Sequence, residues 1–330
     1  MSRATQAKRI AVAAAYGGGS VGAVGALAYG VILSQAMLAR RTIPIATSPP
    51  PRGDGVYGAV FDGEPVRLVV LGDSSAAGFG VARPGETVGA VVAEGLAQEL
   101  RRPVRLRCFA VVGAQSSGLP PQVEQALEQQ PDVAVICVGG NDVTHRVSVA
   151  LAVRHLVTAV RELRAAGVEV VVGTCPDLGT IRPILPPLRW LARYWSRQMA
   201  AAQTIAAVEA GARTVSLGDL LGPSFYSDPD RMFSYDRFHP SAEGYAAAAA
   251  ALLPTVVAAM TQTHEVLRAG EGMRTLPQAA VEAAAIAGTE VSAASVAGRE
   301  RGPAGRWAEL RHRVWPRGAR PATPSTVEAT

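Results

Sequence analysis

Apolar runs of strand length alternate with helix-like segments over most of the chain, from about residue 66 to residue 260. Short runs dense in Val, Leu and Ile are typical of strands that are buried on both faces of a parallel sheet. We expect strands at 66–71, 104–112, 133–139, 168–174 and 212–217, and helices at 85–100, 120–130, 147–166 and 241–260. Five strands separated by helices predict a parallel sheet covered by helices on both faces.

An uncharged, mostly apolar run lies near the N-terminus. No charged residue occurs between Arg9 and Arg40, and about 20 apolar residues suffice to cross a bilayer. We therefore expect residues 1–41 to form a single-pass transmembrane anchor. A cleaved signal peptide is the alternative, although no small-residue cleavage site stands out before Arg40. Basic residues flank the run equally on both sides, so the side of the membrane that the rest of the chain faces is not predicted.

Two further segments lack the alternation of strands and helices. Residues 42–64 contain three consecutive prolines and read as a Pro/Gly linker, which places the globular domain at 65–261. Residues 262–330 lose the apolar blocks and predict a largely disordered tail. Within it, the segment 305–320 has the composition of an amphipathic helix on an anionic membrane surface, and a solvated basic segment is an equal alternative.

Composition and charge restrict the functional classes. Hydrophobic residues make up 48% of the chain and aromatic residues 5%, so the core must consist mainly of aliphatic side chains. The formal net charge is +5, but the segment 299–320 alone carries seven Arg against two Glu, an excess of five. The rest is close to neutral, and no nucleic-acid partner is expected. The three cysteines, Cys108, Cys137 and Cys175, have no zinc-site spacing and suit buried positions.

The first expected strand is followed by Gly72, Asp73 and Ser74. Carboxyl ends of parallel strands meet at the ligand crevice, so polar residues just beyond them are candidates for chemistry. Ser74 could begin the next helix, where its own N–H and the helix dipole would favour a developing oxyanion. A serine or aspartate in this place can also be an ordinary helix cap.

The next two strand ends carry Gly113 and the group Gly139, Gly140, Asn141 and Asp142. A glycine allows a backbone N–H to approach a ligand closely, and an asparagine side chain donates a hydrogen bond without titrating. Both are suitable oxyanion donors. A bare turn is the alternative explanation for each glycine motif.

Asp236 and His239 directly precede the last expected helix. At this spacing on a turn, the carboxylate can reach one imidazole nitrogen and leave the other free to accept a serine proton. A surface aspartate and a core histidine are the alternative.

Together these four blocks resemble the GDSL or SGNH hydrolases, over about residues 66–260. The resemblance implies a flavodoxin-like three-layer α/β/α sandwich with a parallel sheet of about five strands. It implies that Ser74 is the nucleophile, that His239 is the base and that Asp236 is its acidic partner. The oxyanion donors would be the Ser74 N–H, Gly113 and Asn141. Val111 stands where the family usually has an asparagine that braces the loop, so the rigidity of this loop is in question.

The implied function is a serine ester hydrolase of lipase or esterase type, which needs no metal or organic cofactor and acts on a small-molecule or lipid ester. A glycan O-deacetylase or acyltransferase is the alternative, followed by a noncatalytic membrane-tethered binding protein. Nine of the seventeen aromatic residues fall between 190 and 245, where they could line an acyl pocket or pack a helix. The sequence does not predict the oligomeric state.

Overall fold

A seven-stranded sheet forms the centre of the computed structural model, which describes residues 26–39, 41–42, 49–261 and 290–291. The strands are β1 (Gly55–Tyr57), β2 (Val66–Gly72), β3 (Val104–Cys108), β4 (Val133–Cys137), β5 (Glu169–Gly173), β6 (Arg213–Val215) and β7 (Glu290–Val291). Their order is β1-β3-β2-β4-β5-β6-β7, and the five from β3 to β6 are parallel. This is the doubly wound order of flavodoxin-like sheets, so the predicted fold class is confirmed.

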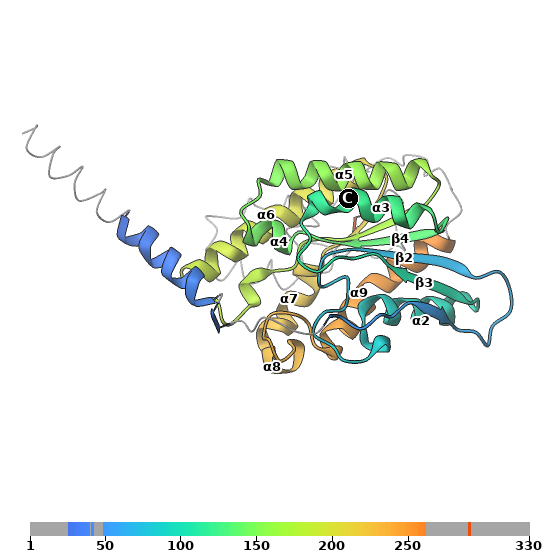
Figure 1. Cartoon of the computed structure of the whole chain (residues 1–330), viewed down its shortest axis with the longest axis horizontal. Coiled ribbons are helices and arrows are strands. Elements are labelled where there is room, and N and C mark those ends of the chain that lie inside the picture. The colour runs from blue at the N-terminus through green and yellow to red at the C-terminus, as the bar shows by residue number, and fades with distance from the viewer. Residues whose placement is uncertain (1–25, 40, 43–48, 262–289, 292–330) are drawn as a thin grey trace, which may run out of the picture.

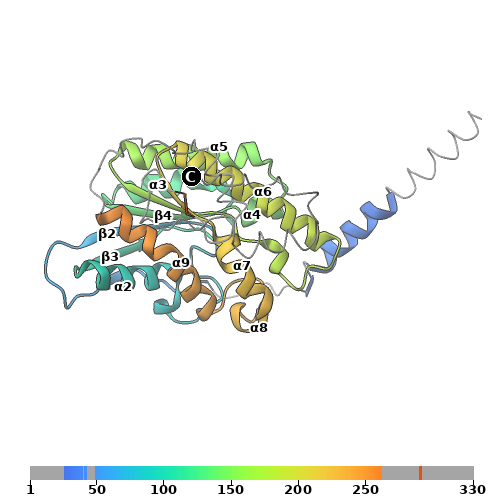
Figure 2. The same ribbon diagram turned by 180° about the vertical axis from the view of Figure 1, so that it is seen from behind.

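Helices cover both faces of the sheet and complete three layers (Figures 1 and 2). α3 and α5 lie on one face with part of α6, and α2 and α9 lie on the other. The helices are α2 (Val88–Leu100), α3 (Leu119–Leu127), α4 (Gly140–Thr144), α5 (Val149–Ala165), α6 (Leu188–Glu209), α7 (Leu217–Ser227), α8 (Pro229–Met232) and α9 (Ala242–Thr261).

Each face of the sheet has its own apolar core. Along β2, Leu68 and Val70 pack toward α2 and α9, whereas Val69 and Leu71 pack toward α3 and α5. Successive side chains of a strand point to opposite faces, so a strand covered on both sides must be apolar at every position. This explains the dense apolar runs that predicted the sheet, such as β4, which is apolar at every position.

The outer strands differ from the central ones. In β3, Val104 and Leu106 are buried while Arg105 and Arg107 are exposed, because only one face of this strand is covered. β1 pairs antiparallel with β3, and β7 pairs antiparallel with β6. Neither was predicted: β1 lies in the segment expected as a linker and β7 in the expected tail. Residues 1–25 and the basic segment 305–320 lie outside the described residues.

An apolar helix, Ala26–Ala39, projects from the body of the molecule (Figure 1). It continues the uncharged run expected to be an anchor, of which the first part lies outside the described residues. Among the described helices, α9 is the one long and apolar enough to span a membrane, but half of its most apolar stretch is buried. Since Tyr245 and Leu252 of α9 are in the core, this helix is typical of a soluble domain's interior.

Candidate active site

The turn after β2 carries Ser74. Gly72 has a φ of +137°, and a Cβ there would lie 1.8 Å from the carbonyl oxygen of Cys137, so only glycine fits. Ser74 lies in a turn and not at a helix start, because Gly78 and Gly80 also have positive φ and the next α-helix begins at Val88. The expectation that a helix dipole acts at Ser74 is therefore wrong.

The loop between α8 and α9 carries Asp236 and His239. A β-bridge between Phe233 and Pro240 closes the loop, and the Ser234 N–H donates to the His239 carbonyl oxygen at 2.8 Å. The sequence predicted a turn at this place. Its closure fixes the backbone on both sides of the two titratable residues.

Ser74, His239 and Asp236 form one continuous hydrogen-bonded chain. The Nε2 atom of His239 lies 2.9 Å from the Ser74 Oγ, and its Nδ1 lies 2.6 Å from Asp236 Oδ2. The rings of Phe79 and Phe238 pack against the imidazole, with centroid distances of 4.6 and 4.9 Å. A largely buried imidazole is thus held with one nitrogen toward a hydroxyl and the other toward a carboxylate. This is the geometry that a general base requires.

Asp236 is surrounded by hydrogen-bond donors. Its Oδ1 accepts the backbone N–H groups of Phe238 and His239, each at 2.9 Å, and the Ser234 hydroxyl at 3.0 Å. Burial by itself would raise the pKa of Asp236, but hydrogen bonds from the imidazole and the two backbone N–H groups outweigh it and lower the pKa to about 2. The carboxylate is therefore charged at neutral pH.

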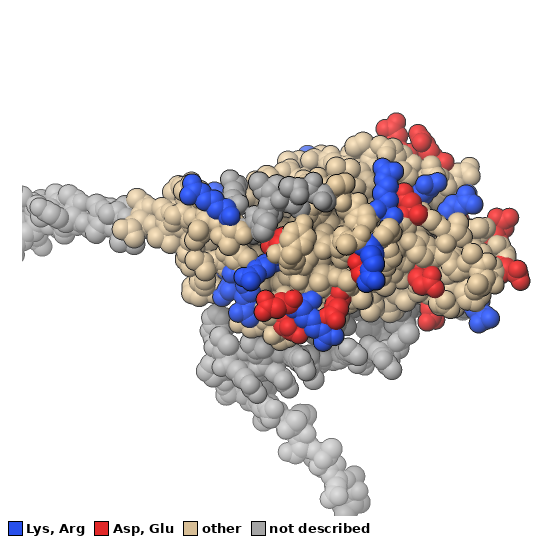
Figure 3. All heavy atoms as spheres, turned by 60° about the horizontal axis from the view of Figure 1, so that its bottom comes forward, with Lys and Arg blue, Asp and Glu red and all other residues tan. Residues whose placement is uncertain are grey.

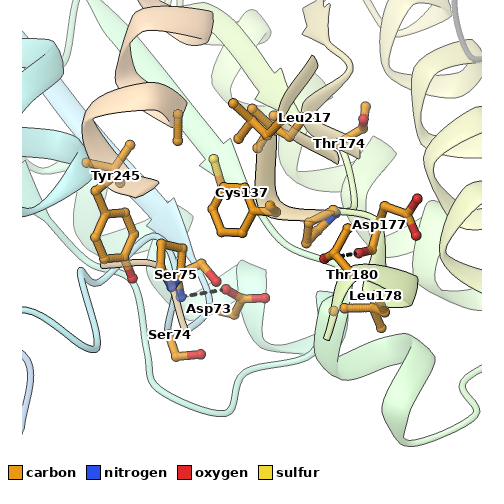
Figure 4. Close-up of a pocket in the computed structure, with 18 of the residues that line it drawn as sticks. Asp73, Ser74, Ser75, Cys137, Thr174, Asp177, Leu178, Thr180, Leu217 and Tyr245 are labelled. Carbon is orange, nitrogen blue, oxygen red and sulfur yellow. Dashed lines mark hydrogen bonds between the residues drawn. The ribbon is translucent and has the colours of Figure 1, made fainter. Parts of the chain in front are cut away.

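Asp73, next to Ser74, is a second buried carboxyl group with the opposite shift. Burial raises the pKa of Asp73 to about 6, although the Ser75 N–H and the nearby His239 oppose the increase. The Ser75 N–H donates to Asp73 Oδ1 at 2.9 Å, as Figure 4 shows. Asp73 thus braces its own turn while remaining close to the proposed base.

The candidate oxyanion donors lie on two neighbouring loops. Asn141 belongs to α4, and its Nδ2 donates to the carbonyl oxygen of Ala114 at 3.0 Å. Gly113 has a φ of +80°, which favours glycine. Ser74 and Asn141 line the same cavity, whereas Gly113 does not line it. The structure therefore places Asn141 and Ser74 at the same cavity, and Gly113 is connected to them through the adjacent Ala114.

Asp142 has a role that the sequence did not reveal. It is completely buried and accepts the Ser116 N–H at 3.0 and 3.1 Å and the Ser116 hydroxyl at 2.9 Å. Asp142 thus braces the loop that carries Gly113. No spacing in the sequence signals a pairing between residues that are this far apart.

Two buried glutamines also support the site and were missed. Gln122 of α3 donates to the Gly72 carbonyl oxygen and accepts the Gly72 N–H, at 3.0 and 2.7 Å. Gln203 of α6 donates to the Val138 carbonyl oxygen and accepts the Cys175 N–H, at 2.9 and 2.7 Å. Each satisfies backbone groups where a strand ends, and so fixes the edge from which the site residues extend.

A cavity of about 110 Å³ opens beside Ser74. Figure 4 shows Cys137, Leu217 and Tyr245 among the side chains gathered around it. Several of the aromatic residues between 190 and 245 line the cavity: Phe225, Phe233, Phe238 and Tyr245. Others are exposed and take no part in it: Trp190, Tyr194, Tyr226 and Tyr235. The aromatic crowding thus predicted the pocket only in part.

The described residues contain no group of three or more His, Cys, Asp and Glu side chains that could hold a metal ion. The three cysteines are free; Cys137 and Cys175 are buried and Cys108 is half-buried. Burial raises the pKa of Cys137 to about 12 and that of Cys108 to about 11, so these thiols are poor nucleophiles.

Comparison with known proteins assigns the family. Residues 70–247 match the model of the GDSL-like Lipase/Acylhydrolase family. The GDSL-like esterase Rv1075c of Mycobacterium tuberculosis (strain ATCC 25618 / H37Rv) is 41% identical over 271 residues, which cover 78% of this chain and 85% of that protein.

Two solved structures are also similar to this chain. The lipase Lip_vut3 from a goat rumen metagenome has a TM-score of 0.47 and 18% identity, covering 57% of this chain and 95% of its own. The acetylxylan esterase Axe2 from Geobacillus stearothermophilus has a TM-score of 0.45 and 21% identity, covering 57% of this chain and 92% of its own. By its family match and its esterase relative, this chain belongs to the GDSL-like lipase/acylhydrolase family and is a carboxylic ester hydrolase.

Proposed function

We propose that the protein hydrolyses acyl esters through a Ser74–His239–Asp236 triad and an acyl-enzyme intermediate. The observation that carries the proposal is the unbroken hydrogen-bonded chain from the Ser74 hydroxyl through the imidazole to the Asp236 carboxylate. His239 Nε2 takes the hydroxyl proton as Ser74 Oγ attacks the acyl carbonyl, and Asp236 stabilises the imidazolium. His239 then gives this proton to the leaving alcohol, and the acyl group stays on Ser74.

Deacylation uses the same residues in reverse. His239 removes a proton from a water molecule, the water oxygen attacks the acyl carbon, and the returned proton releases the Ser74 hydroxyl and a free acid. In both steps a tetrahedral oxyanion forms. We assign its stabilisation to the Ser74 and Gly113 N–H groups and to Asn141. An asparagine amide has two hydrogens, and Ala114 occupies one of them, which leaves the other for the oxyanion.

The cavity favours a small apolar acyl group. Its walls include Leu217, Leu221 and Phe225 of α7 and Leu252 of α9. A dry cavity of about 150 Å³ holds one benzene molecule, and the cavity beside Ser74 is somewhat smaller, at about 110 Å³. We therefore infer that an acyl chain of a few carbons fits without rearrangement of α7 or α9.

A fluorophosphonate probe tests the nucleophile. The full chain should be labelled at Ser74, and Ser74→Ala should abolish both labelling and ester hydrolysis, because Cys108, Cys137 and Cys175 are poorly reactive. Ser227→Ala, which removes an exposed serine hydroxyl on α7, is the matched control and should change neither. Undiminished hydrolysis by the Ser74→Ala variant would end the proposal.

We also infer that the uncharged run before Arg40 anchors the chain in a membrane as a single span. In the described part of this run, Leu27 is 72% exposed, and Leu33, Met37 and Leu38 are exposed as well. A helix that is apolar on all sides is stable only inside a protein or a membrane, and most of this helix, apart from Gln35 and Ala39 near its end, is not covered by the described part of the chain.

A further inference from the structure

The N-terminal helix (Ala26–Ala39) is attached to the catalytic domain at a defined place. The side chain of Gln35 donates to the Pro186 carbonyl oxygen at 2.6 Å and accepts the Leu188 N–H at 3.1 Å. Ala39, at the end of the helix, is buried. In Figure 3 the helix projects from the body without a charged side chain on the visible face. The attachment therefore orients the domain relative to the helix.

The segment that receives the helix also forms part of the active-site wall. Thr180 and Ile181 line the cavity beside Ser74. Ile181 and Ile184 belong to the same buried cluster as Ala39. The base of the helix and the cavity are thus only a few packed residues apart, and whatever surrounds the helix lies close to the cavity.

Exposed apolar and aromatic side chains continue from this place onto α6. Trp190 is 66% exposed and Tyr194 is 57% exposed, and they lie four residues apart, on the same side of the helix. Leu185, just before α6, is exposed as well. Trp and Tyr combine an apolar ring with a polar group and suit the boundary between lipid and water.

The same region is basic. Between residues 178 and 208 the sequence has four arginines and no acidic residue. Two of these arginines, Arg193 and Arg197, pair with Asp177 and Asp219 and add little charge to the surface. Arg182 is exposed and lies over the ring of Tyr226, with its guanidinium carbon 5.0 Å from the ring centroid. Arg41, just beyond the N-terminal helix, is also exposed. Basic residues beside exposed aromatic rings complement the negative surface of an anionic bilayer.

We propose that this docking face, defined by Arg182, Leu185, Trp190 and Tyr194, lies on the surface of an anionic bilayer. The N-terminal helix enters the bilayer beside this face, and the hydrogen bonds of Gln35 fix the position of the helix relative to the face. The cavity next to Ser74 then faces the headgroup region, and esters dissolved in the membrane reach it without crossing bulk water. Only this last consequence rests on the proposed ester hydrolysis; the docking itself does not.

Tryptophan fluorescence of the full chain tests the docking. The chain has four tryptophans, and replacing Trp195, Trp307 and Trp315 by Phe leaves Trp190 as the reporter. The protein is reconstituted in vesicles of phosphatidylcholine and phosphatidylglycerol with and without brominated acyl chains. Emission from Trp190 should fall roughly twofold with the brominated lipids, because an interfacial side chain lies within reach of the bromine atoms.

The matched control places the reporter at the opposite end of the domain. Val60 is 86% exposed in the loop between β1 and β2, far from the N-terminal helix in both ribbon views (Figures 1 and 2). A Val60→Trp variant with all four native tryptophans replaced by Phe should show no quenching. The N-terminal helix anchors the Trp190 reporter and the Val60→Trp reporter in the same way. Equal losses of emission from the two reporters, or no loss from Trp190, would therefore overturn the proposed docking.

A rate comparison tests the consequence for catalysis. The double variant Trp190→Ser, Tyr194→Ser should hydrolyse an ester dissolved in the vesicles several-fold more slowly, and a water-soluble short-chain ester at the wild-type rate. Equal rates on the vesicle ester would contradict the consequence. A wild-type protein that hydrolyses neither ester would instead contradict the proposed function, and the emission experiment would still decide the docking.

Discussion

Replacing Asp73 by Asn should stabilise the protein at neutral and alkaline pH and change its stability little in acid. Burial raises the pKa of Asp73 from 3.8 to about 6. Each pKa unit corresponds to about 1.4 kcal/mol, so keeping Asp73 ionised in the folded protein costs about 3 kcal/mol. Because the folded pKa is the higher one, this cost is absent below about pH 4, grows between about pH 4 and pH 6, and is complete above that range.

Asn removes the charge and keeps an oxygen that can accept the Ser75 N–H. The free energy of unfolding of Asp73→Asn relative to wild type should therefore rise by up to about 3 kcal/mol between about pH 4 and pH 8. Urea unfolding of the full chain in a mild detergent, followed by far-UV circular dichroism, measures this difference. If the two proteins differ in unfolding free energy by the same amount at both pH values, Asp73 has the same pKa in the folded and unfolded chains. That result would refute the raised pKa of Asp73.

Asp236→Asn provides a comparison of opposite sign. The hydrogen bonds to Asp236 overcome its burial and lower the pKa to about 2, so its ionised form stabilises the fold by about 2 kcal/mol. This contribution is present above about pH 4 and is lost as the pH falls toward about 2. At neutral pH, Asp236→Asn should therefore destabilise the protein while Asp73→Asn stabilises it. A general effect of adding an amide to the site would shift both variants in the same direction.

The remaining predictions concern the two loops of the proposed oxyanion hole. Asn141→Ala should lower kcat by roughly a hundredfold with little change in the unfolding temperature, and an unchanged kcat would remove Asn141 from the oxyanion hole. Ser116→Ala removes the hydroxyl that donates to Asp142 and should cost about 1–2 kcal/mol of stability. It should lower kcat several-fold at constant KM, with partial rescue by Ser116→Thr. Ser117→Ala changes an exposed neighbour and should alter neither the stability nor kcat. A similar loss in both variants would contradict the role of the Ser116–Asp142 hydrogen bond in bracing the loop.

The sheet could be predicted because burial on both faces leaves a local signature. Every residue of β4 is buried, and its sequence is apolar throughout. The four candidate blocks could be placed for a related reason: each directly follows a predicted strand or precedes a predicted helix. Asp236 and His239 are also close in sequence, so their contact needs only a turn. The strands therefore brought the correct segments to one edge of the sheet.

The parts that were missed depend on contacts between distant segments or on very short elements. Gln122 meets Gly72 and Gln203 meets Cys175 across the layers, and neither glutamine differs in sequence context from a surface residue. β1 has three residues, too few to show a periodicity. The helix start expected at Ser74 is wrong because the chain turns at Gly78 and Gly80, both with positive φ, before the next α-helix begins at Val88.

The contacts of the Gly113 loop show why Val111 can replace the family's asparagine. Val111 is 53% exposed, so its side chain braces little. However, the Val111 N–H donates to the Gly72 carbonyl oxygen at 3.1 Å, and the Ala114 carbonyl oxygen accepts from Asn141 at 3.0 Å. Ser116 is then held by the buried Asp142. Tethers on both sides of Gly113 restrict the position of its N–H, so the loop gains from its neighbours the rigidity that an asparagine at position 111 would otherwise supply.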